Sequence, residues 1–169
     1  MDASSEHAGS VRPPFPLTGR LLGLDYGSKR LGLAVCNTEQ TIASPAQNYN
    51  RKGLPADAKF LRKVLEDYRV VGLIVGLPVH MSGDEGEKAR ESRAFGDWAA
   101  QELKLPVRYF DERHTSLIAR HRMTLAKLSP QKIKERLDMV AAQILLQNYL
   151  DSPNRLSPVD LPPASMPTR

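Results

Sequence analysis

The chain has 169 residues, 41% of them hydrophobic and 25% charged, which is typical of one soluble globular domain with its own core. No apolar run reaches the roughly 18 to 20 residues that cross a bilayer, and the N-terminus lacks the apolar segment of a secretory signal, so we expect a cytoplasmic protein without membrane contacts. The net charge of +5 is compatible with a polyanionic partner, and Cys36, the only cysteine, excludes an internal disulfide and a Cys-rich zinc site.

Both ends of the chain are rich in proline. Eight of the 13 prolines lie in residues 1–19 and 151–169, where few apolar residues could be buried. This composition is typical of segments without regular structure. We therefore expect flexible tails at 1–19 and 151–169 around one folded domain at residues 20–150.

The first half of this domain begins with strands. Residues 20–26 and 30–36 predict a hairpin, joined by a turn at Gly27 and Ser28. We expect Gly27 to take a positive φ in this turn and Gly32 to allow a close approach of the strands. A weaker strand and an amphipathic helix follow, at residues 41–48 and 55–68.

The second half alternates strands with helices. The expected elements are a strand at 70–75, a helix from 82 to about 103, a strand at 106–110, a helix at 115–125 and a last helix that reaches residue 150. Ser82 with Glu85 forms a capping box for the first of these helices, and Ser129 with Pro130 marks the start of the last. The order β-β-β-α-β-α-β-α-α predicts an α/β fold, with a five-stranded mixed sheet and helices on both faces. This order is typical of ribonuclease H-like proteins and of one lobe of actin-type ATPases.

Packing does not explain three acidic positions. Asp25 ends the first strand, Asp111 and Glu112 follow the fifth strand, and Asp138 adjoins the apolar stripe of the last helix. Substrates of open α/β sheets bind beyond the carboxyl ends of parallel strands, so we expect these acids to converge there. Clustered carboxylates repel one another unless a hard cation such as Mg²⁺ binds them. Two such ions can activate a water and stabilise the leaving oxygen of a phosphodiester.

Each acid also has a plainer explanation when it is taken alone. Asp25 could cap the amides of the turn, and Asp111 is better explained as a cap of the following helix than as a metal ligand. Asp138 could lie at the exposed edge of its helix, paired with Lys134. A shared site is favoured because the predicted topology puts all these acids near one edge of the sheet.

Four stretches between residues 20 and 150 together resemble a known family. They are GLDYGSKRLGLAV, VVGLIVGLPVHMSGDEG, LPVRYFDERHTS and LDMVAAQILLQNYL, in this order. They resemble the YqgF-type family of Holliday junction resolvase-like proteins, also called pre-16S rRNA nucleases. The resemblance implies a ribonuclease H-like fold related to the RuvC resolvases, and cleavage of a nucleic-acid backbone with one or two Mg²⁺ or Mn²⁺ ions. It implies that Asp25, Glu112 and Asp138 are the catalytic residues and metal ligands.

The resemblance also suggests residues that hold the substrate. GLPVHMSG is similar to the family's GLPLNMDG loop, with His80 in place of Asn and Ser82 in place of Asp. DERHTS is similar to DERLST, which makes Arg113 and Thr115 candidates for phosphate or supporting contacts. Cations of the first turn and of the helix after the loop could line a backbone groove, or could be plain solvated charges. The candidate substrate-binding residues are Lys29, Arg30, His80, Arg90, Arg113 and Thr115.

The resemblance favours maturation of the 5′ end of 16S rRNA as the function, with a precursor rRNA as the partner. The alternatives are a Holliday junction resolvase that acts on branched DNA and a non-catalytic nucleic-acid-binding module. An actin-type ATPase would need a second lobe, for which the chain is too short. A resolvase needs two active sites, so a homodimer would suit the DNA function and a monomer would suit RNA trimming.

Overall fold

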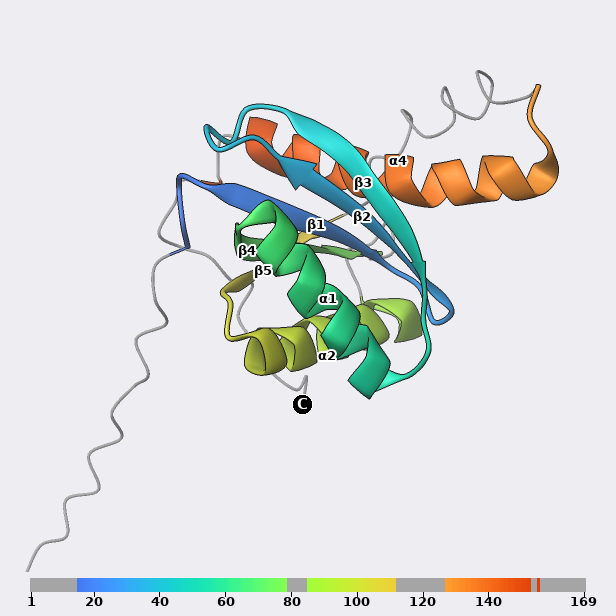
Figure 1. Cartoon of the computed structure of the whole chain (residues 1–169), viewed down its shortest axis with the longest axis horizontal. Coiled ribbons are helices and arrows are strands. Elements are labelled where there is room, and N and C mark those ends of the chain that lie inside the picture. The colour runs from blue at the N-terminus through green and yellow to red at the C-terminus, as the bar shows by residue number, and fades with distance from the viewer. Residues whose placement is uncertain (1–14, 79–84, 112–126, 153–154, 156–169) are drawn as a thin grey trace, which may run out of the picture.

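A five-stranded sheet in the order β3-β2-β1-β4-β5 forms the centre of the protein (Figure 1). The computed structural model describes residues 15–78, 85–111, 127–152 and 155. The strands are β1 (Arg20–Tyr26), β2 (Arg30–Cys36), β3 (Ala43–Asn50), β4 (Val70–Leu77) and β5 (Val107–Asp111). The first three form an antiparallel meander, and β4 and β5 run parallel to β1. The predicted mixed sheet is therefore confirmed.

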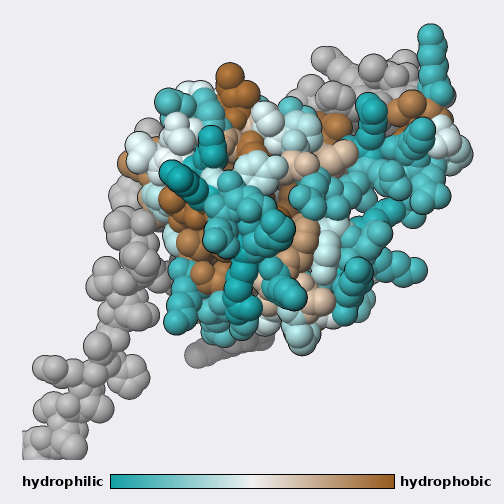
Figure 2. Space-filling model, viewed as in Figure 1, coloured by the Kyte–Doolittle hydropathy of each residue, from teal (hydrophilic) through white to brown (hydrophobic). Residues whose placement is uncertain are grey.

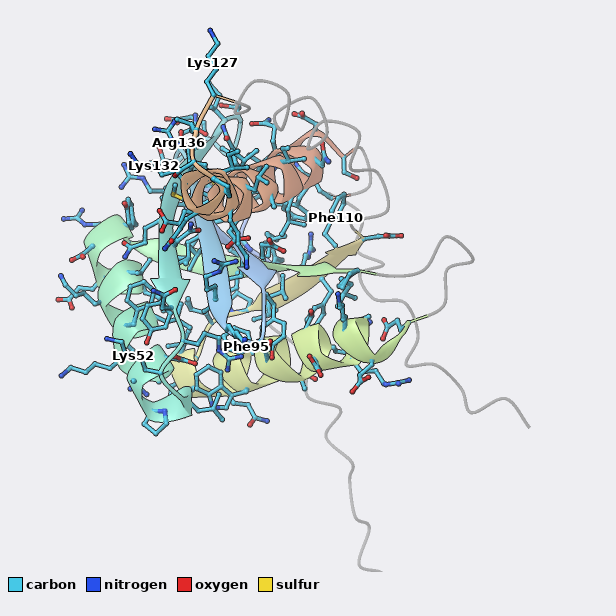
Figure 3. The ribbon with its side chains drawn as sticks, turned by 90° about the vertical axis from the view of Figure 1, so that its right-hand side faces the viewer. Lys52, Phe95, Phe110, Lys127, Lys132 and Arg136 are labelled. Carbon is cyan, nitrogen blue, oxygen red and sulfur yellow. The ribbon has the colours of Figure 1, made fainter. Side chains whose placement is uncertain are left out.

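Helices cover both faces of this sheet, as predicted. They are α1 (Leu54–Tyr68), α2 (Glu87–Leu103) and α4 (Pro130–Asp151). Figure 1 shows α1 and α2 on one face and α4 on the other. Two apolar clusters fill the layers, and in Figure 3 the labelled Phe95 lies on the α2 side while Phe110 lies toward α4. No helix in the described part of the chain is long and apolar enough to span a membrane.

Side chains of the central strands alternate between these two layers, as the period of a strand requires. In β1, Leu21 belongs to the cluster beneath α4, whereas Leu22 and Leu24 belong to the cluster beneath α1 and α2. All three are fully buried, because the sheet is covered on both faces. Cys36 is also buried, as expected, and its Sγ lies 3.2 Å from the amide nitrogen of Leu21, which donates to it.

Two predicted helix starts have different outcomes. Ser129 is the N-cap of α4 and its hydroxyl accepts a hydrogen bond from the amide of Lys132, with Pro130 in the first turn, which confirms the prediction. The capping box at Ser82 is not confirmed, because α2 begins at Glu87 with Gly86 at its N-cap. Ser82 itself and the helix expected at 115–125 lie outside the described residues.

The packed core begins earlier than the expected boundary at residue 20. Phe15 is buried, edge-on to the ring of Tyr149, and the guanidinium of Arg108 lies 4.5 Å from its ring centroid. Gly72 makes room for this ring, since a Cβ there would lie 3.0 Å from the Cζ of Phe15. One aromatic side chain therefore ties residues 15–19, expected as part of a tail, to the sheet.

Candidate active site

Asp25 lies at the carboxyl end of β1, on the face of the sheet that α4 covers. It follows Leu24, whose Cα pairs with Val75 of the parallel strand β4, and its own Cα pairs with Gly32 of β2. Alternation along β1 places Asp25 on the same face as Leu21. The predicted position of this carboxylate at the carboxyl edge of the sheet is therefore confirmed.

Asp138 reaches the same place because two glycines let α4 pack directly on the strands. A Cβ at Gly32 would lie 2.6 Å from the carbonyl carbon of Asp138, and a Cβ at Gly23 would lie 2.9 Å from the Cβ of Leu146. Real Cβ atoms do not approach so closely, so only glycine permits this spacing. The close approach expected at Gly32 exists, but its partner is the helix rather than a neighbouring strand.

The two carboxylates line one pocket of about 230 Å³. Its lining residues are Asp25, Tyr26, Gly27, Ser28, Lys29, Arg30 and Asp138. A water molecule in the liquid takes about 30 Å³, so the pocket has room for a hydrated cation together with a phosphate group. Two predicted acids and two predicted cations therefore meet here, although they come from segments more than 100 residues apart.

Burial raises the pKa of both acids, and the charge of Asp138 adds to the shift of Asp25. Burial, and secondly the charge of Asp138, raise the pKa of Asp25 to about 7. Burial also raises the pKa of Asp138, while the positive charges of Arg30 and Lys134 act in the opposite direction. Repulsion between two desolvated carboxylates is the electrostatic pattern that a bound cation relieves.

The ion pair of Asp138 is formed with Arg30. The Nε of Arg30 lies 3.0 Å from the Oδ2 of Asp138, and both side chains are 27% exposed. The alternative pairing with Lys134 is therefore wrong, since Lys134 acts on Asp138 only through space. Asp138 Oδ2 is nevertheless a buried oxygen that accepts no well-aligned hydrogen bond from the described residues.

The donor set fits a hard divalent cation. Both acids offer oxygen ligands, which Mg²⁺ and Mn²⁺ prefer, and the buried Oδ2 of Asp138 has unused acceptor capacity. Within residues 15–78, 85–111, 127–152 and 155, no group of three acidic, histidine or cysteine side chains could hold a metal. Glu112, the predicted third ligand, lies outside these ranges, directly after Asp111, whose Cα pairs with Leu77 at the end of β4.

A partly buried arginine, Arg51, which the sequence analysis did not single out, holds the turn of this pocket from the other face of the sheet. Arg51 Nε lies 3.0 Å from Asp57 Oδ2, and its Nη1 donates to the hydroxyl of Tyr26 at 3.1 Å. The same nitrogen donates to the carbonyls of Gly27 and Ser28, at 3.4 and 3.3 Å. Asp57 is fully buried, so this ion pair is part of the core.

These contacts explain the turn better than a glycine conformation does. Gly19 and Gly53 are the described glycines with positive φ, so the positive φ expected at Gly27 is wrong. Gly27 is required by space, because a Cβ there would lie 2.7 Å from the carbonyl oxygen of Arg30. The sequence could have indicated a structural role for Asp57, since it is an acid in the first turn of a helix. No pattern in the sequence indicated its contact with Arg51.

The remaining predicted substrate-binding residues divide into two groups. Lys29 is exposed in the turn and Arg30 is half-buried beside Asp138, and both line the pocket. Arg90 is exposed on α2 and is not part of the pocket lining. His80, Arg113 and Thr115 lie outside the described residues.

Comparisons with known proteins identify the family of the chain. The family model described as "RuvX: Holliday junction resolvase" matches residues 19–152. A protein of Rhodopirellula baltica named "Putative pre-16S rRNA nuclease" is 38% identical over 138 residues, which are 82% of this chain and 80% of the relative. A protein of the same name from Cereibacter sphaeroides is 39% identical over 136 residues, 80% of this chain and 85% of the relative.

A solved structure shares the fold. The fowlpox virus resolvase, crystallised with Holliday junction DNA, superposes with a TM-score of 0.50 at 12% identity, over 78% of this chain and 96% of the viral one. The predicted ribonuclease H-like α/β fold is thus confirmed together with the predicted family. From the match of its model across the whole sheet and α4, and from the two relatives, the chain belongs to the RuvX family.

Proposed function

We propose that the protein is a metal-dependent nuclease that hydrolyses phosphodiester bonds in precursor 16S rRNA. The observation that carries this proposal is the pocket shared by Asp25 and Asp138, in which one carboxyl has its pKa raised to about 7. A group with so perturbed a pKa in a polar pocket is typical of a functional site. The names of the relatives from Rhodopirellula baltica and Cereibacter sphaeroides support precursor rRNA as the substrate.

Asp25, Asp138 and Glu112 would hold one or two Mg²⁺ or Mn²⁺ ions. A divalent ion bound here would neutralise the charge that develops on the scissile phosphate and its leaving oxygen. Asp25, near half protonation at neutral pH, must release its proton from the carboxyl oxygen before it can act as a ligand. Because a proton and the cation compete for Asp25, the site should bind the cation more tightly above pH 7 than below it.

Arg30 and Lys29 would orient the reacting groups. Arg30 fixes the carboxylate of Asp138 through their ion pair, and its remaining guanidinium nitrogens can donate to a phosphate oxygen. Lys29 is exposed at the mouth of the pocket, where an ammonium can contact the backbone without reading sequence. Arg51 has no contact with substrate in this proposal and acts only by holding the turn.

Branched DNA is the second candidate substrate. The family model is described as a Holliday junction resolvase, and the fowlpox enzyme that shares the fold was crystallised with such a junction. Resolution needs two active sites, hence a homodimer, whereas trimming of an rRNA precursor needs only one. The alternative of a non-catalytic nucleic-acid-binding module predicts binding without cleavage.

A side-by-side cleavage assay tests these alternatives. Purified protein is incubated with a labelled 16S rRNA precursor and with a labelled four-way junction, each with Mg²⁺, with Mn²⁺ or with EDTA. We expect cleavage of the precursor that depends on metal and that Asp25→Asn and Glu112→Gln abolish. Asp67→Asn, which changes an exposed carboxylate of α1, is the matched control and should cleave normally.

Three other outcomes would contradict the proposal in different ways. Symmetric cleavage of the junction alone, by a dimer, would show that the substrate is branched DNA. Tight RNA binding without cleavage would favour the non-catalytic module. Cleavage that persists in Asp25→Asn would show that the pocket is not the catalytic site.

A further inference from the structure

The first turns of α4 have mostly exposed side chains, and their contact with the sheet includes a hydrogen bond from the side chain of Asn48 in β3 to the carbonyl oxygen of Glu135. The buried residues of α4 begin at Ala142, twelve residues after the helix starts at Pro130. Figure 1 shows this segment projecting past the end of the sheet where β1 meets its turn. We call residues 127–136 the basic overhang.

The basic overhang carries a concentrated positive charge. It contains four cations, Lys127, Lys132, Lys134 and Arg136, against a single acid, Glu135, and all five side chains are exposed. Figure 2 shows hydrophilic residues along this end of the molecule. The excess charge lies in one short segment, the turn before α4 and its first turns, so the cations are concentrated in one region of the surface.

None of the four cations of the overhang, Lys127, Lys132, Lys134 and Arg136, has an ion-pair partner among the described residues. Elsewhere on the described surface, Arg62 pairs with Glu102 and Lys63 pairs with Asp67. The cations of the overhang are therefore available to an external anion. Lys132 and Arg136 are one turn apart and share one side of the helix.

The overhang begins at the carboxylate pocket. Lys134 is one helical turn before Asp138 and is close enough for its charge to lower the pKa of that acid. Lys132 is six residues before Asp138, which corresponds to about 9 Å along the helix axis. Figure 3, a view along α4 from its N-terminal end, places Lys127, Lys132 and Arg136 together there.

We propose that Lys132 and Arg136, with Lys127 beyond them, bind the phosphate backbone of the nucleic-acid strand that continues from the carboxylate pocket. This inference rests on the proposed nuclease function and names the part of the protein that holds the substrate outside the pocket. Charge complementarity selects the occupant: an extended polyanion that leaves the pocket past Arg30 and Lys134 can cross the start of α4 to Lys132 and Arg136, which lie on another side of the same helix. Contacts of this type position the backbone and carry no base specificity.

Salt dependence of binding tests the proposal. An RNA stem-loop with a single-stranded flank and a fluorescent label is titrated with protein in EDTA, by anisotropy, at several salt concentrations. Each phosphate contact contributes about −0.7 to −0.9 to the slope of log K against log salt. The variant Lys132→Gln/Arg136→Gln should therefore bind more weakly, with a slope reduced in magnitude by about 1.4 to 1.8.

The chain offers a control pair of cations on another helix, one of which, Lys63, pairs with Asp67. Lys59 and Lys63 are also exposed and one helical turn apart, but on α1, which packs on the opposite face of the sheet. Lys59→Gln/Lys63→Gln removes the same charge and should leave the slope unchanged. The charge-retaining Lys132→Arg/Arg136→Lys variant should also keep the wild-type slope, and equal circular dichroism melts show that all variants fold.

The outcomes separate this inference from the proposed function. If wild-type protein cleaves and binds RNA but both glutamine pairs give the same slope, the inference is overturned and the overhang is left for an acidic protein partner. If no form of the protein binds RNA or branched DNA, the proposed nuclease function fails, and this inference fails with it. A reduced slope for the α4 pair alone supports the proposal.

Discussion

Gly32 lies directly against the backbone of Asp138. A Cβ at residue 32 would be 2.6 Å from the carbonyl carbon of Asp138, and Gly32 is also the Cα partner of Asp25 across the β1–β2 ladder. One residue without a side chain thus brings the two carboxylates of the pocket together. The distance between them depends on how closely α4 sits on β2.

Gly32→Ala should displace α4 and disturb the metal site. The added methyl group meets backbone, which cannot move aside alone, so we expect a loss of about 1 to 3 kcal/mol in the free energy of unfolding. Mn²⁺ affinity should fall at least tenfold, because Asp138 moves with the helix. Urea unfolding and Mn²⁺ titration calorimetry measure the two effects.

Gly53→Ala is the control for Gly32→Ala. Gly53 has a φ of +103° and open space around it, so alanine there strains the backbone without touching the pocket. It should destabilise the protein and leave Mn²⁺ affinity unchanged. Equal losses of affinity in both variants would mean that Gly32 acts through overall stability only.

The metal-free protein should become less stable as the pH rises through 7. Asp25 has a pKa of about 7 in the folded protein and an ordinary value of 3.8, so the folded state binds the proton more tightly. The stabilisation that comes from the protonated Asp25 is complete below pH 4 and is lost as the pH rises from about 4 to 8. At 1.36 kcal/mol per pH unit, the loss amounts to at most about 4 kcal/mol.

Asp25→Asn should reduce this pH dependence, because only the raised pKa of Asp138 then remains in the pocket. The amide stays neutral, so the unfolding midpoint of the variant in EDTA should exceed that of the wild type at pH 8 and not at pH 4. Thermal melts across this range provide the measurement, with Asp67→Asn as an exposed control. A variant that melts below the wild type at pH 8 would show that Asp25 is not destabilising when ionised.

Divalent cations should restore the stability that the protein loses when Asp25 ionises at high pH. A ligand that binds only the folded state stabilises it by about 2.7 kcal/mol at 100 times its dissociation constant. Because the cation competes with the proton on Asp25, the rise in melting temperature with Mg²⁺ or Mn²⁺ should be larger at pH 8 than at pH 5. It should vanish in Asp25→Asn. An increase that is independent of both pH and Asp25 would place the bound ion elsewhere.

Arg51 should matter for stability and, through the turn, for the pocket. Arg51→Met leaves the fully buried carboxylate of Asp57 without its partner, which typically costs about 3 to 5 kcal/mol. Asp57→Leu alone leaves the guanidinium unpaired and should also destabilise. The double variant should recover much of the loss, because an apolar pair can replace a buried ion pair.

Mn²⁺ titration of the Arg51 double variant distinguishes packing from positioning. If the hydrogen bonds from Arg51 to the carbonyls of Gly27 and Ser28 hold the pocket, affinity stays reduced even where stability is recovered. Restored affinity in the double variant would show that the arginine contributes only to the core. Urea unfolding at the same pH gives the stability of each variant.

The sequence by itself determined the order of the described elements and predicted the two acids, Asp25 and Asp138, that line the pocket. Strands at 20–26 and 30–36 match β1 and β2 in full, and Ser129 caps α4 as predicted, because apolar periodicity and helix caps are local properties of the chain. Asp25 could be recognised because a carboxylate at the end of a buried strand has no packing role. The family resemblance predicted that Asp25 and Asp138 belong to the same site.

Only the tertiary structure decided how these residues meet. The pairing of Asp138 with Arg30 rather than Lys134, the contact of Gly32 with α4 and the link from Arg51 to Asp57 each depend on where one packed element sits on another. The burial of Phe15 has the same cause, since it fills space above Gly72. Contacts between distant segments follow from the close packing of the whole core, and no local pattern of residues encodes them.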